Sequence, residues 1–308
     1  SVGQSGHYTL LGSHVFCLGA CGALRKIWSL DMIPPLRIAH RGASGRGLAP
    51  ENTLAAFEKA LDIGVDMLEI DVRVTGDGQL IVLHDPSLDR TTDCEGIVRE
   101  LGIEKIRQAD AGHGERIPIL REVFDLARHR APVLLEIKSD FIAELVVQAI
   151  AEAQFAEQVV VQSFNPQTVE RVKRMAPHLP ASLLIGELPT APSRLRARRL
   201  VSQVLETGAN TLSIWHATLT PSLIEEMRKR GVTVWAWTVD EEITMRDLAM
   251  MGVQGLVTNY PDVLNNVLED LMESGQVQPP LGRRRLQNRG RWARRRQLRK
   301  MQAMRKGN

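Results

Sequence analysis

The sequence predicts an α/β protein folded as a (β/α)8 TIM barrel, with a small insertion after the second strand region. Between residues 36 and 275, short apolar strands alternate with helical stretches eight times, which matches the size of this barrel. Each connection is long enough for the helical crossover that parallel strands require. Polar side chains also occur near the C-terminal ends of several strands, where barrel active sites lie. This last observation favours the barrel over the structural alternative, a doubly wound open sheet.

The expected elements follow from the spacing of apolar residues. A helix is predicted over residues 50–65, for example, because Leu54, Phe57, Ala60 and Leu61 recur at helical spacing. The predicted strands occupy residues 36–42, 67–75, 133–138, 158–163, 181–187, 211–215, 232–239 and 255–259. The predicted helices occupy residues 50–65, 119–129, 141–154, 166–175, 193–207, 221–230, 241–251 and 261–273.

Three regions are expected along the chain: an apolar leader over 1–35, the catalytic barrel over 36–275 and a basic tail over 276–308. Within the barrel, a short extended piece at 80–84 precedes an irregular insertion at about 86–117. The leader is predicted to be a membrane anchor or disordered, because its apolar run is at the lower limit for a membrane span.

The formal net charge of +3 conceals an uneven distribution. Residues 281–308 hold twelve Lys and Arg and no acid, whereas the rest of the chain has 27 basic against 36 acidic residues. The tail is therefore predicted to be disordered, with docking on an anionic membrane surface as the sharper interpretation. Nucleic acid is the other anionic partner that such a tail would suit, but it is not the favoured one.

The cysteines bear on the cellular compartment. Cys17, Cys21 and Cys94 are too few and too scattered for a disulfide framework. Reduced thiols indicate a cytoplasmic or membrane-associated protein, with a secreted or periplasmic one as the open alternative.

Carboxylates interrupt two strands that are otherwise apolar. Glu69 and Asp71 are two residues apart, so on a strand both side chains leave by the same face. The same alternation places Glu136 and Lys138 on one face of a later strand. Three carboxylates in one cavity would repel each other, and a divalent cation would remove that repulsion. Oxygen-only ligands suit Mg2+ or Ca2+. The alternative is that the carboxylates form structural ion pairs with Arg73 and Lys138.

Two histidines and two cations occur at strand ends as well. His40 and His84 suit general acid and base work, because histidine titrates near neutral pH. Arg41 follows His40 directly, and a guanidinium binds phosphate through two parallel hydrogen bonds. Lys138 would add a second phosphate contact, or else form a salt bridge with a neighbouring carboxylate.

The positions of two further residues in the sequence predict where their side chains lie. Trp237 lies near a strand end and shares a face with Trp235, so it is expected to line either a substrate wall or the barrel core. Asp85 precedes Pro86 and is expected to cap a turn.

In order and spacing, five motifs resemble those of the glycerophosphodiester phosphodiesterase family. They are His40-Arg41-Gly42, Pro50-Glu51-Asn52-Thr53, Glu69-x-Asp71, His84-Asp85 and Leu135-Glu136-Ile137-Lys138. Arg90-Thr91-Thr92, Ser163-Phe164 and Thr258-Asn259-x-Pro261 are similar to later motifs of that family. The resemblance covers about residues 36–270.

The resemblance implies a TIM barrel that hydrolyses glycerophosphodiesters to glycerol 3-phosphate and an alcohol. It implies one divalent cation, Mg2+ or Ca2+, bound by Glu69, Asp71 and Glu136. It also implies His40 and His84 as the acid–base pair. Arg41 and Lys138 would then hold the phosphate, and Trp237 would match the family's strand-seven aromatic residue.

Several questions stay open at this point. The nucleophile is either water or the glycerol 2-hydroxyl. A lysophospholipase D-like activity on the same barrel is the rival enzyme, and it needs an apolar groove for an acyl chain. A non-catalytic, membrane-associated binding barrel is the rival of another class. The oligomeric state is left undetermined.

Overall fold

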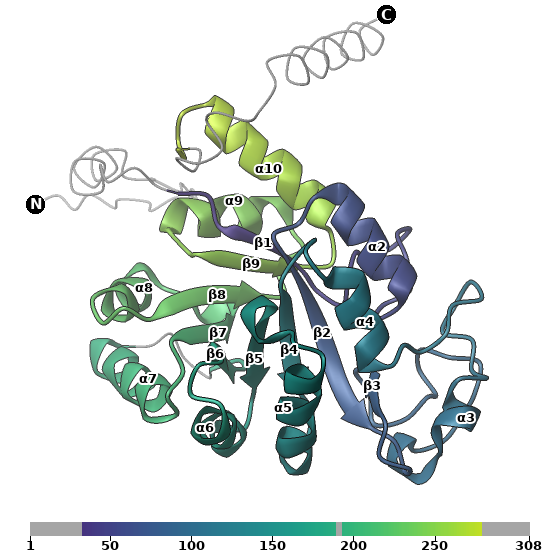
Figure 1. Ribbon diagram of the computed structural model, residues 1–308. Helices are drawn as coiled ribbons and strands as arrows, with labels where there is room; N and C mark the ends of the chain where they lie inside the picture. The colour runs from purple at the N-terminus through teal and green to yellow at the C-terminus, as the bar shows by residue number, and fades with distance from the viewer. Residues whose placement is uncertain (1–32, 189–192, 279–308) are drawn as a thin grey trace, which may run out of the picture.

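Eight parallel strands close into a barrel surrounded by helices in the computed structural model, which describes residues 33–188 and 193–278 (Figure 1). The sheet closes because β1 (Leu36–Ala39) pairs with both β2 (Met67–Val74) and β9 (Gly255–Thr258). Ile38 lies opposite Met67 on one side and Val257 on the other. This closure confirms the predicted TIM barrel and rules out the open sheet.

The remaining elements alternate as the sequence predicts. The other barrel strands are β4 (Val133–Ile137), β5 (Val159–Ser163), β6 (Ala181–Ile185), β7 (Thr211–Trp215) and β8 (Thr233–Trp237). The helices between successive strands are α2 (Leu54–Ile63), α4 (Leu120–Ala127), α5 (Ala143–Glu152), α6 (Pro166–Met175), α7 (Arg194–Glu206), α8 (Pro221–Arg228) and α9 (Glu242–Met251). Helix α10 (Pro261–Glu273) follows β9 and packs against β1 and α9.

Side-chain alternation along the strands separates two cores. The outward-facing residues pack against the helices, as Leu68, Ile70 and Val72 of β2 do. The inward-facing residues fill the barrel with a cluster of Ile38, Met67, Leu134, Trp235 and Val257. Apart from Trp237 on β8, the next inward positions along the same strands hold polar residues, so the apolar cluster forms the floor of the site described below.

Two element boundaries differ from the prediction by more than two residues. The strand expected over 36–42 ends at Ala39, because Arg41 and Gly42 adopt positive φ angles of 55° and 84°. A Cβ at Gly42 would lie 2.6 Å from the carbonyl carbon of Ala56, so this turn can pack against α2 only with glycine there.

The helix expected from residue 50 begins at Leu54 instead. Asn52 has a φ of 58°, which no helix residue adopts. Thr53 then caps the helix, since its hydroxyl accepts a hydrogen bond of 3.2 Å from the Ala56 amide.

The segment after β2 contains the expected extended piece, and its insertion holds more regular structure than predicted. Strand β3 (Leu80–Val82) runs antiparallel to the end of β2, and a short helix α3 (Ile103–Ile106) follows a 3-10 turn at Val98–Glu100. These residues enclose a small core of their own, beside the barrel (Figure 1). Its buried members are Ile81, Leu83, Leu88, Val98, Ile106, Ala109, Ala111 and Ile117.

The predicted leader and tail lie outside the described residues, apart from residues 33–35 and 276–278. Among the helices that are described, none combines the length and apolar character needed to cross a membrane.

Candidate active site

Three buried carboxylates meet at the C-terminal end of β2 and β4. Asp71 lies opposite Glu136 in the parallel register, and Glu69 is the next inward residue of β2. Each residue contributes one oxygen to a set in which all three lie within 4.8 Å of one another. The residues are only 1–7% exposed. Charged groups so buried are costly unless they are paired or bind a metal.

The charges of this cluster are only partly balanced. Lys138 Nζ lies 2.7 Å from Glu136 and 3.3 Å from Asp71, and Arg41 Nε lies 3.2 Å from Asp71. Burial and the neighbouring carboxylates raise the pKa of Glu69, and burial with Asp71 raises the pKa of Glu136 to about 7. Burial alone would raise the pKa of Asp71, but Lys138 and Arg41 lower it to about 2.

The alternative of structural ion pairs is therefore only partly right. Lys138 forms such pairs, but the Arg73 side chain donates a 2.8 Å hydrogen bond to the His84 carbonyl. Glu69 accepts hydrogen bonds from two uncharged donors, the Arg41 backbone amide at 3.0 Å and the Gln162 side chain at 3.4 Å. An all-oxygen donor set with surplus negative charge fits a hard divalent cation.

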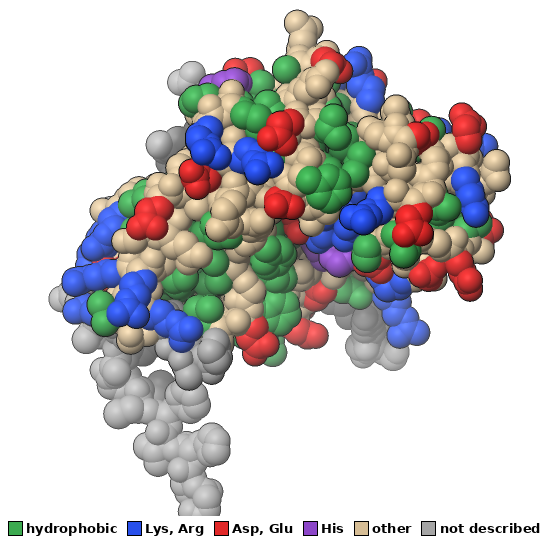
Figure 2. Space-filling view, turned by 90° about the horizontal axis from the view of Figure 1, so that it is seen from below, with side chains coloured by type: hydrophobic (Ala, Val, Ile, Leu, Met, Phe, Trp, Pro, Cys, Tyr) green, Lys and Arg blue, Asp and Glu red, His purple; other side chains and the backbone are tan. Residues whose placement is uncertain are grey.

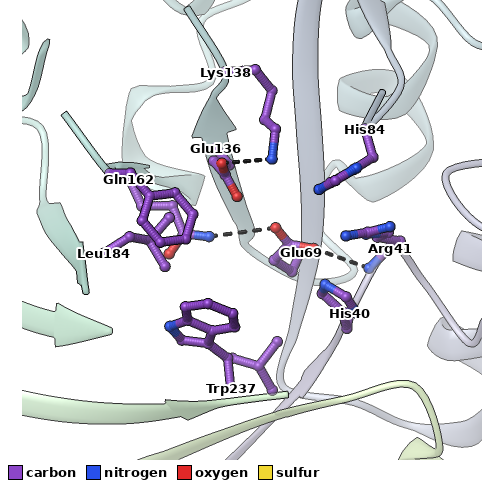
Figure 3. Close-up of a pocket in the computed structure, with 11 residues that line it drawn as sticks. His40, Arg41, Glu69, His84, Glu136, Lys138, Gln162, Leu184 and Trp237 are labelled. Carbon is purple, nitrogen blue, oxygen red and sulfur yellow. Dashed lines mark hydrogen bonds and ion pairs between the residues drawn. The ribbon is translucent and has the colours of Figure 1, made fainter. Parts of the chain in front are cut away.

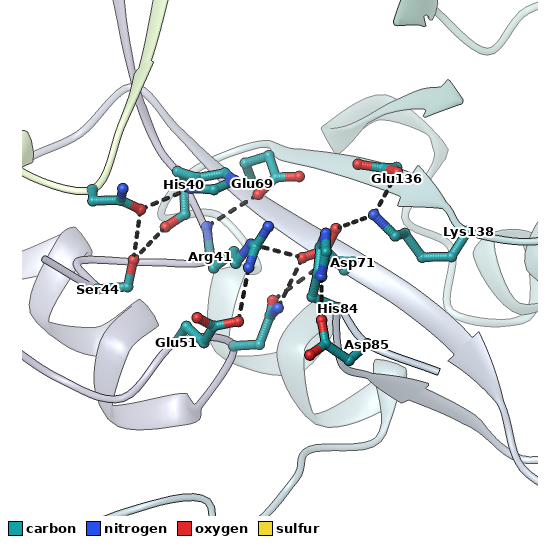
Figure 4. A network of polar contacts seen from close by, with 12 residues as sticks. His40, Arg41, Ser44, Glu51, Glu69, Asp71, His84, Asp85, Glu136 and Lys138 are labelled. Carbon is teal, nitrogen blue, oxygen red and sulfur yellow. Dashed lines mark hydrogen bonds and ion pairs between the residues drawn. The ribbon is translucent and has the colours of Figure 1, made fainter. Parts of the chain in front are cut away.

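His40 stands directly after β1 and points into the same region (Figure 4). Its Nδ1 lies 2.7 Å from the Asn259 side-chain oxygen. Burial lowers the pKa of His40 to about 4, and the nearby Arg41 acts in the same direction. The ring is therefore neutral at physiological pH and has one nitrogen that can accept a proton.

His84 follows β3 and is held by a carboxylate rather than an amide. Its Nδ1 lies 2.5 Å from Asp85 Oδ1. The sequence predicts a turn cap at Asp85, but the structure places that carboxylate between His84 and Arg90, at 2.5 Å from Arg90 Nε. Burial lowers the pKa of His84, while Asp71 and the bond to Asp85 oppose the shift.

Arg90 joins the two halves of this network. It donates to both oxygens of Glu51, at 2.7 and 3.0 Å, and Glu51 in turn accepts from Arg41 at 2.8 Å. A continuous chain of charge-assisted hydrogen bonds thus runs from His84 through Asp85, Arg90 and Glu51 to Arg41. Such bonds are stronger than neutral ones and fix side-chain geometry.

Arg90→Met should lower kcat/KM about tenfold or more, because Asp85 and Glu51 would lose the group that orients them. The melting temperature should change little, since Arg90 is about half exposed. Arg121→Met is the matched control, because Arg121 forms an exposed pair with Asp125 on α4. Unchanged kinetics in Arg90→Met would show that the network does not matter for turnover.

A cavity of about 280 Å3 opens above these groups (Figure 3). Charged and polar residues form one side, and Phe164, Leu184 and Trp237 form the apolar side. Trp237 packs edge-to-face with both Phe164 and Trp215, each at 5.5 Å between ring centroids. On the face shown in Figure 2, histidine, basic and hydrophobic side chains gather around a hollow.

The cavity brings together seven of the eight residues predicted from the sequence. These are His40, Arg41, Glu69, His84, Glu136, Lys138 and Trp237. Asp71 is the exception: it lies behind the others, where Arg41, Lys138 and the Asn52 amide, at 2.9 Å, contact its carboxylate.

Sequence reasoning predicted no site role for several residues that the structure places at the site, since it expected Asp85 to cap a turn and gave Glu51 and Arg90 only as members of motifs. Gln162 and Leu184 line the cavity, and Glu51, Asp85 and Arg90 hold its side chains. A usable signal for Gln162 existed, because it is a polar residue at an inward position of the apolar strand β5.

Comparison with known proteins gives a consistent result. The sequence model of the Glycerophosphoryl diester phosphodiesterase family matches residues 40–263. A protein named glycerophosphodiester phosphodiesterase from Caldanaerobacter subterraneus subsp. tengcongensis is 39% identical over 246 residues, which covers 76% of this chain and 97% of that protein.

Solved structures are similar as well. An Oleispira antarctica phosphodiesterase, in complex with the product sn-glycerol-3-phosphate, has a TM-score of 0.68 at 26% identity, covering 77% of this chain and 97% of that one. The glycerophosphodiester phosphodiesterase of Agrobacterium tumefaciens str. C58 has a TM-score of 0.65 at 28% identity, covering 75% and 99%. The family match, the relatives and the site together show that the chain belongs to the glycerophosphoryl diester phosphodiesterase family.

Proposed function

We propose that this protein hydrolyses glycerophosphodiesters to glycerol 3-phosphate and an alcohol, with His40 and His84 as the acid–base pair. The observation that carries the proposal is the meeting of two histidines, two cations and a carboxylate cluster in one cavity. The likeness to a phosphodiesterase solved with sn-glycerol-3-phosphate supports this substrate class.

The charge at the centre of the site argues for a divalent cation. With Glu69, Asp71 and Glu136 ionised, three negative charges face the two positive charges of Arg41 and Lys138. The surplus negative charge would repel a phosphodiester. Mg2+ or Ca2+ held by the three carboxylates would reverse the sign of the site, and when bound it would neutralise charge on the phosphodiester.

Arg41 and Lys138 would bind the phosphate. Arg41 is fixed by Glu51 and Asp71, and only 16% of its side chain is exposed. Lys138 is 11% exposed and lines the same cavity. Because these two side chains are already held in place and largely shielded from water, they would stabilise the negative charge that develops in the transition state without having to reorient.

The histidines would move the protons. Each ring engages an oxygen acceptor through Nδ1, so Nε2 is the atom left for the substrate. One histidine would remove a proton from the nucleophile, and the other would protonate the leaving alcohol. Both water and the glycerol 2-hydroxyl remain candidates for the nucleophile.

In this proposal, the alcohol group of the substrate would lie against the apolar wall of Phe164, Leu184 and Trp237, which lines the same cavity. A wall of this kind also favours a second candidate function, a lysophospholipase D-like activity in which an acyl chain contacts the same surface.

A product assay tests both activities. The full chain is incubated with glycerophosphocholine, glycerophosphoethanolamine and lysophosphatidylcholine, each with Mg2+, with Ca2+ and with chelator. We expect glycerol 3-phosphate from the first two substrates. Release of choline from lysophosphatidylcholine alone would favour the second candidate. No product under any condition would leave the non-catalytic binding barrel as the better interpretation.

The basic tail is proposed to hold the protein at anionic membranes. The proposed location of the enzyme is therefore the membrane surface or the cytoplasm beside it. Each basic residue near such a surface contributes about 1 kcal/mol. Deleting residues 281–308, which hold twelve Lys and Arg, should therefore weaken binding to phosphatidylserine vesicles by at least tenfold. Cosedimentation measures this, with phosphatidylcholine vesicles as the control. Equal binding of both proteins would rule the tail out as the anchor.

A further inference from the structure

We propose that Asp240, acting through Asn259, is a positioning residue that keeps the proton of His40 on Nδ1 and so presents Nε2 as the basic nitrogen. The inference rests on the proposed catalytic role of His40. It concerns residues that follow three neighbouring strands, β8, β9 and β1.

The Asp240 carboxylate fixes which way the Asn259 amide faces. Asn259 Nδ2 donates a 2.7 Å hydrogen bond to one carboxylate oxygen, and the Asn259 backbone N–H donates to the other at 2.9 Å. The Thr258 hydroxyl donates to that second oxygen at 3.1 Å. Because a carboxylate only accepts, the NH2 group of Asn259 must point toward Asp240.

The orientation of Asn259 then determines the tautomer of His40. The amide oxygen, which cannot donate, lies 2.7 Å from His40 Nδ1. The Ser44 hydroxyl contacts the same oxygen at 3.1 Å and the His40 carbonyl at 2.8 Å (Ser44 and His40 are labelled in Figure 4). The neutral ring must therefore carry its proton on Nδ1, which leaves the lone pair on Nε2.

The carboxylate also has a structural task, because it accepts from the backbone and from Thr258. Removing the side chain would disturb both tasks at once. An isosteric change separates them. In Asp240→Asn, the remaining oxygen can still accept from the backbone and Thr258, but an NH2 group faces the NH2 group of Asn259. Rotation of Asn259 by half a turn resolves that conflict, and its NH2 group then faces His40 Nδ1.

Asp240→Asn should therefore shift the His40 proton to Nε2 and lower kcat about 100-fold or more, with KM and melting temperature little changed. Asn259→Asp alone should also fail, because two carboxylates would face each other at about the 2.7 Å of the present bond. The double variant Asp240→Asn/Asn259→Asp reverses the bond between residues 240 and 259, but it again pairs every donor with an acceptor and keeps an acceptor at His40 Nδ1. Its new carboxylate accepts from His40 Nδ1 and from the new amide, so kcat should return to within about tenfold of wild type.

The experiment uses the full chain with Mg2+ and has two readouts. Steady-state kinetics on glycerophosphocholine give kcat and KM for the wild type, both single variants, the double variant and Glu241→Gln. Glu241 is the control, because it is exposed, adjacent and makes no side-chain cap. The 15N shifts of labelled histidine report the His40 tautomer without any turnover, with His40→Gln providing the assignment.

An exchanged 15N pattern in Asp240→Asn, recovered in the double variant, supports the proposal. An unchanged tautomer in a folded Asp240→Asn protein overturns it, whatever the kinetics. If the tautomer responds but even the wild type releases no product, the proposed function fails while the positioning role of Asp240 stands.

Discussion

His40→Ala should reduce kcat by about 10³-fold or more while the protein still folds. The imidazole lines the cavity from the end of β1, and a side-chain hydrogen bond joins it to Asn259. Loss of a general acid or base costs about 10²- to 10⁴-fold in rate. His84→Ala should have a similar effect, because it removes the second of the two proposed proton-transfer groups. Glycerol 3-phosphate release measures the loss, and the melting temperature with circular dichroism reports the fold.

His178→Ala is the matched control, since His178 is exposed and stands outside the cavity. Imidazole added to His40→Ala is an additional check, because partial rescue would tie the loss to the missing ring. Full activity in a folded His40→Ala protein would contradict the assignment of His40 as a general acid or base.

Most of the site could be predicted because two regularities act together. A strand sends alternate side chains to one face, so residue spacing alone pairs Glu69 with Asp71 and Glu136 with Lys138. A parallel barrel then gathers the C-terminal ends of all its strands at one rim. Neither step depends on the detailed path of the loops.

The parts that could not be predicted depend on those loops. Arg41 reaches Asp71 from a turn with positive φ, with 3.2 Å between its Nε and the carboxylate. The bond between His40 and Asn259 spans 219 residues of sequence across the closure of the barrel. The role of Asp85 escapes prediction for a related reason: its partner Arg90 lies in the insertion, whose path has no periodic signal.

Chelation should lower kcat by at least about 10²-fold, and added Mg2+ or Ca2+ should restore activity. Without a cation, Glu69 and Glu136 face Asp71 at close range, and their pKa values are raised by burial and by that repulsion. Glycerol 3-phosphate release after treatment with EDTA, and then with each metal in excess, measures the effect. An enzyme that is equally active with and without chelator would refute the metal role.

The same cluster predicts how stability depends on pH. A carboxyl whose folded pKa is raised keeps its proton longer in the folded state, so the free energy of unfolding falls as pH rises through the shifted range. For Glu136 this window runs from its usual value of 4.5 to about 7. The lowered pKa of buried His40 acts in the opposite direction over part of this range, so the prediction concerns Glu136 alone. Without metal, the wild type should lose stability relative to Glu136→Gln between pH 5 and pH 8. Urea denaturation at the two pH values, in EDTA, measures the change.

A bound cation should reverse this loss, because it replaces the protons that neutralise the cluster at low pH. At a hundred times its dissociation constant, a ligand specific for the folded state adds about 2.7 kcal/mol. The gain with Mg2+ should be larger at pH 8 than at pH 5, since protons compete for the same oxygens. Glu136→Gln should remove the contribution of Glu136 to the pH dependence and reduce the gain with Mg2+, whereas Glu144→Gln, an exposed change on α5, should do neither. An equal gain in wild type and Glu136→Gln would place the cation elsewhere on the protein.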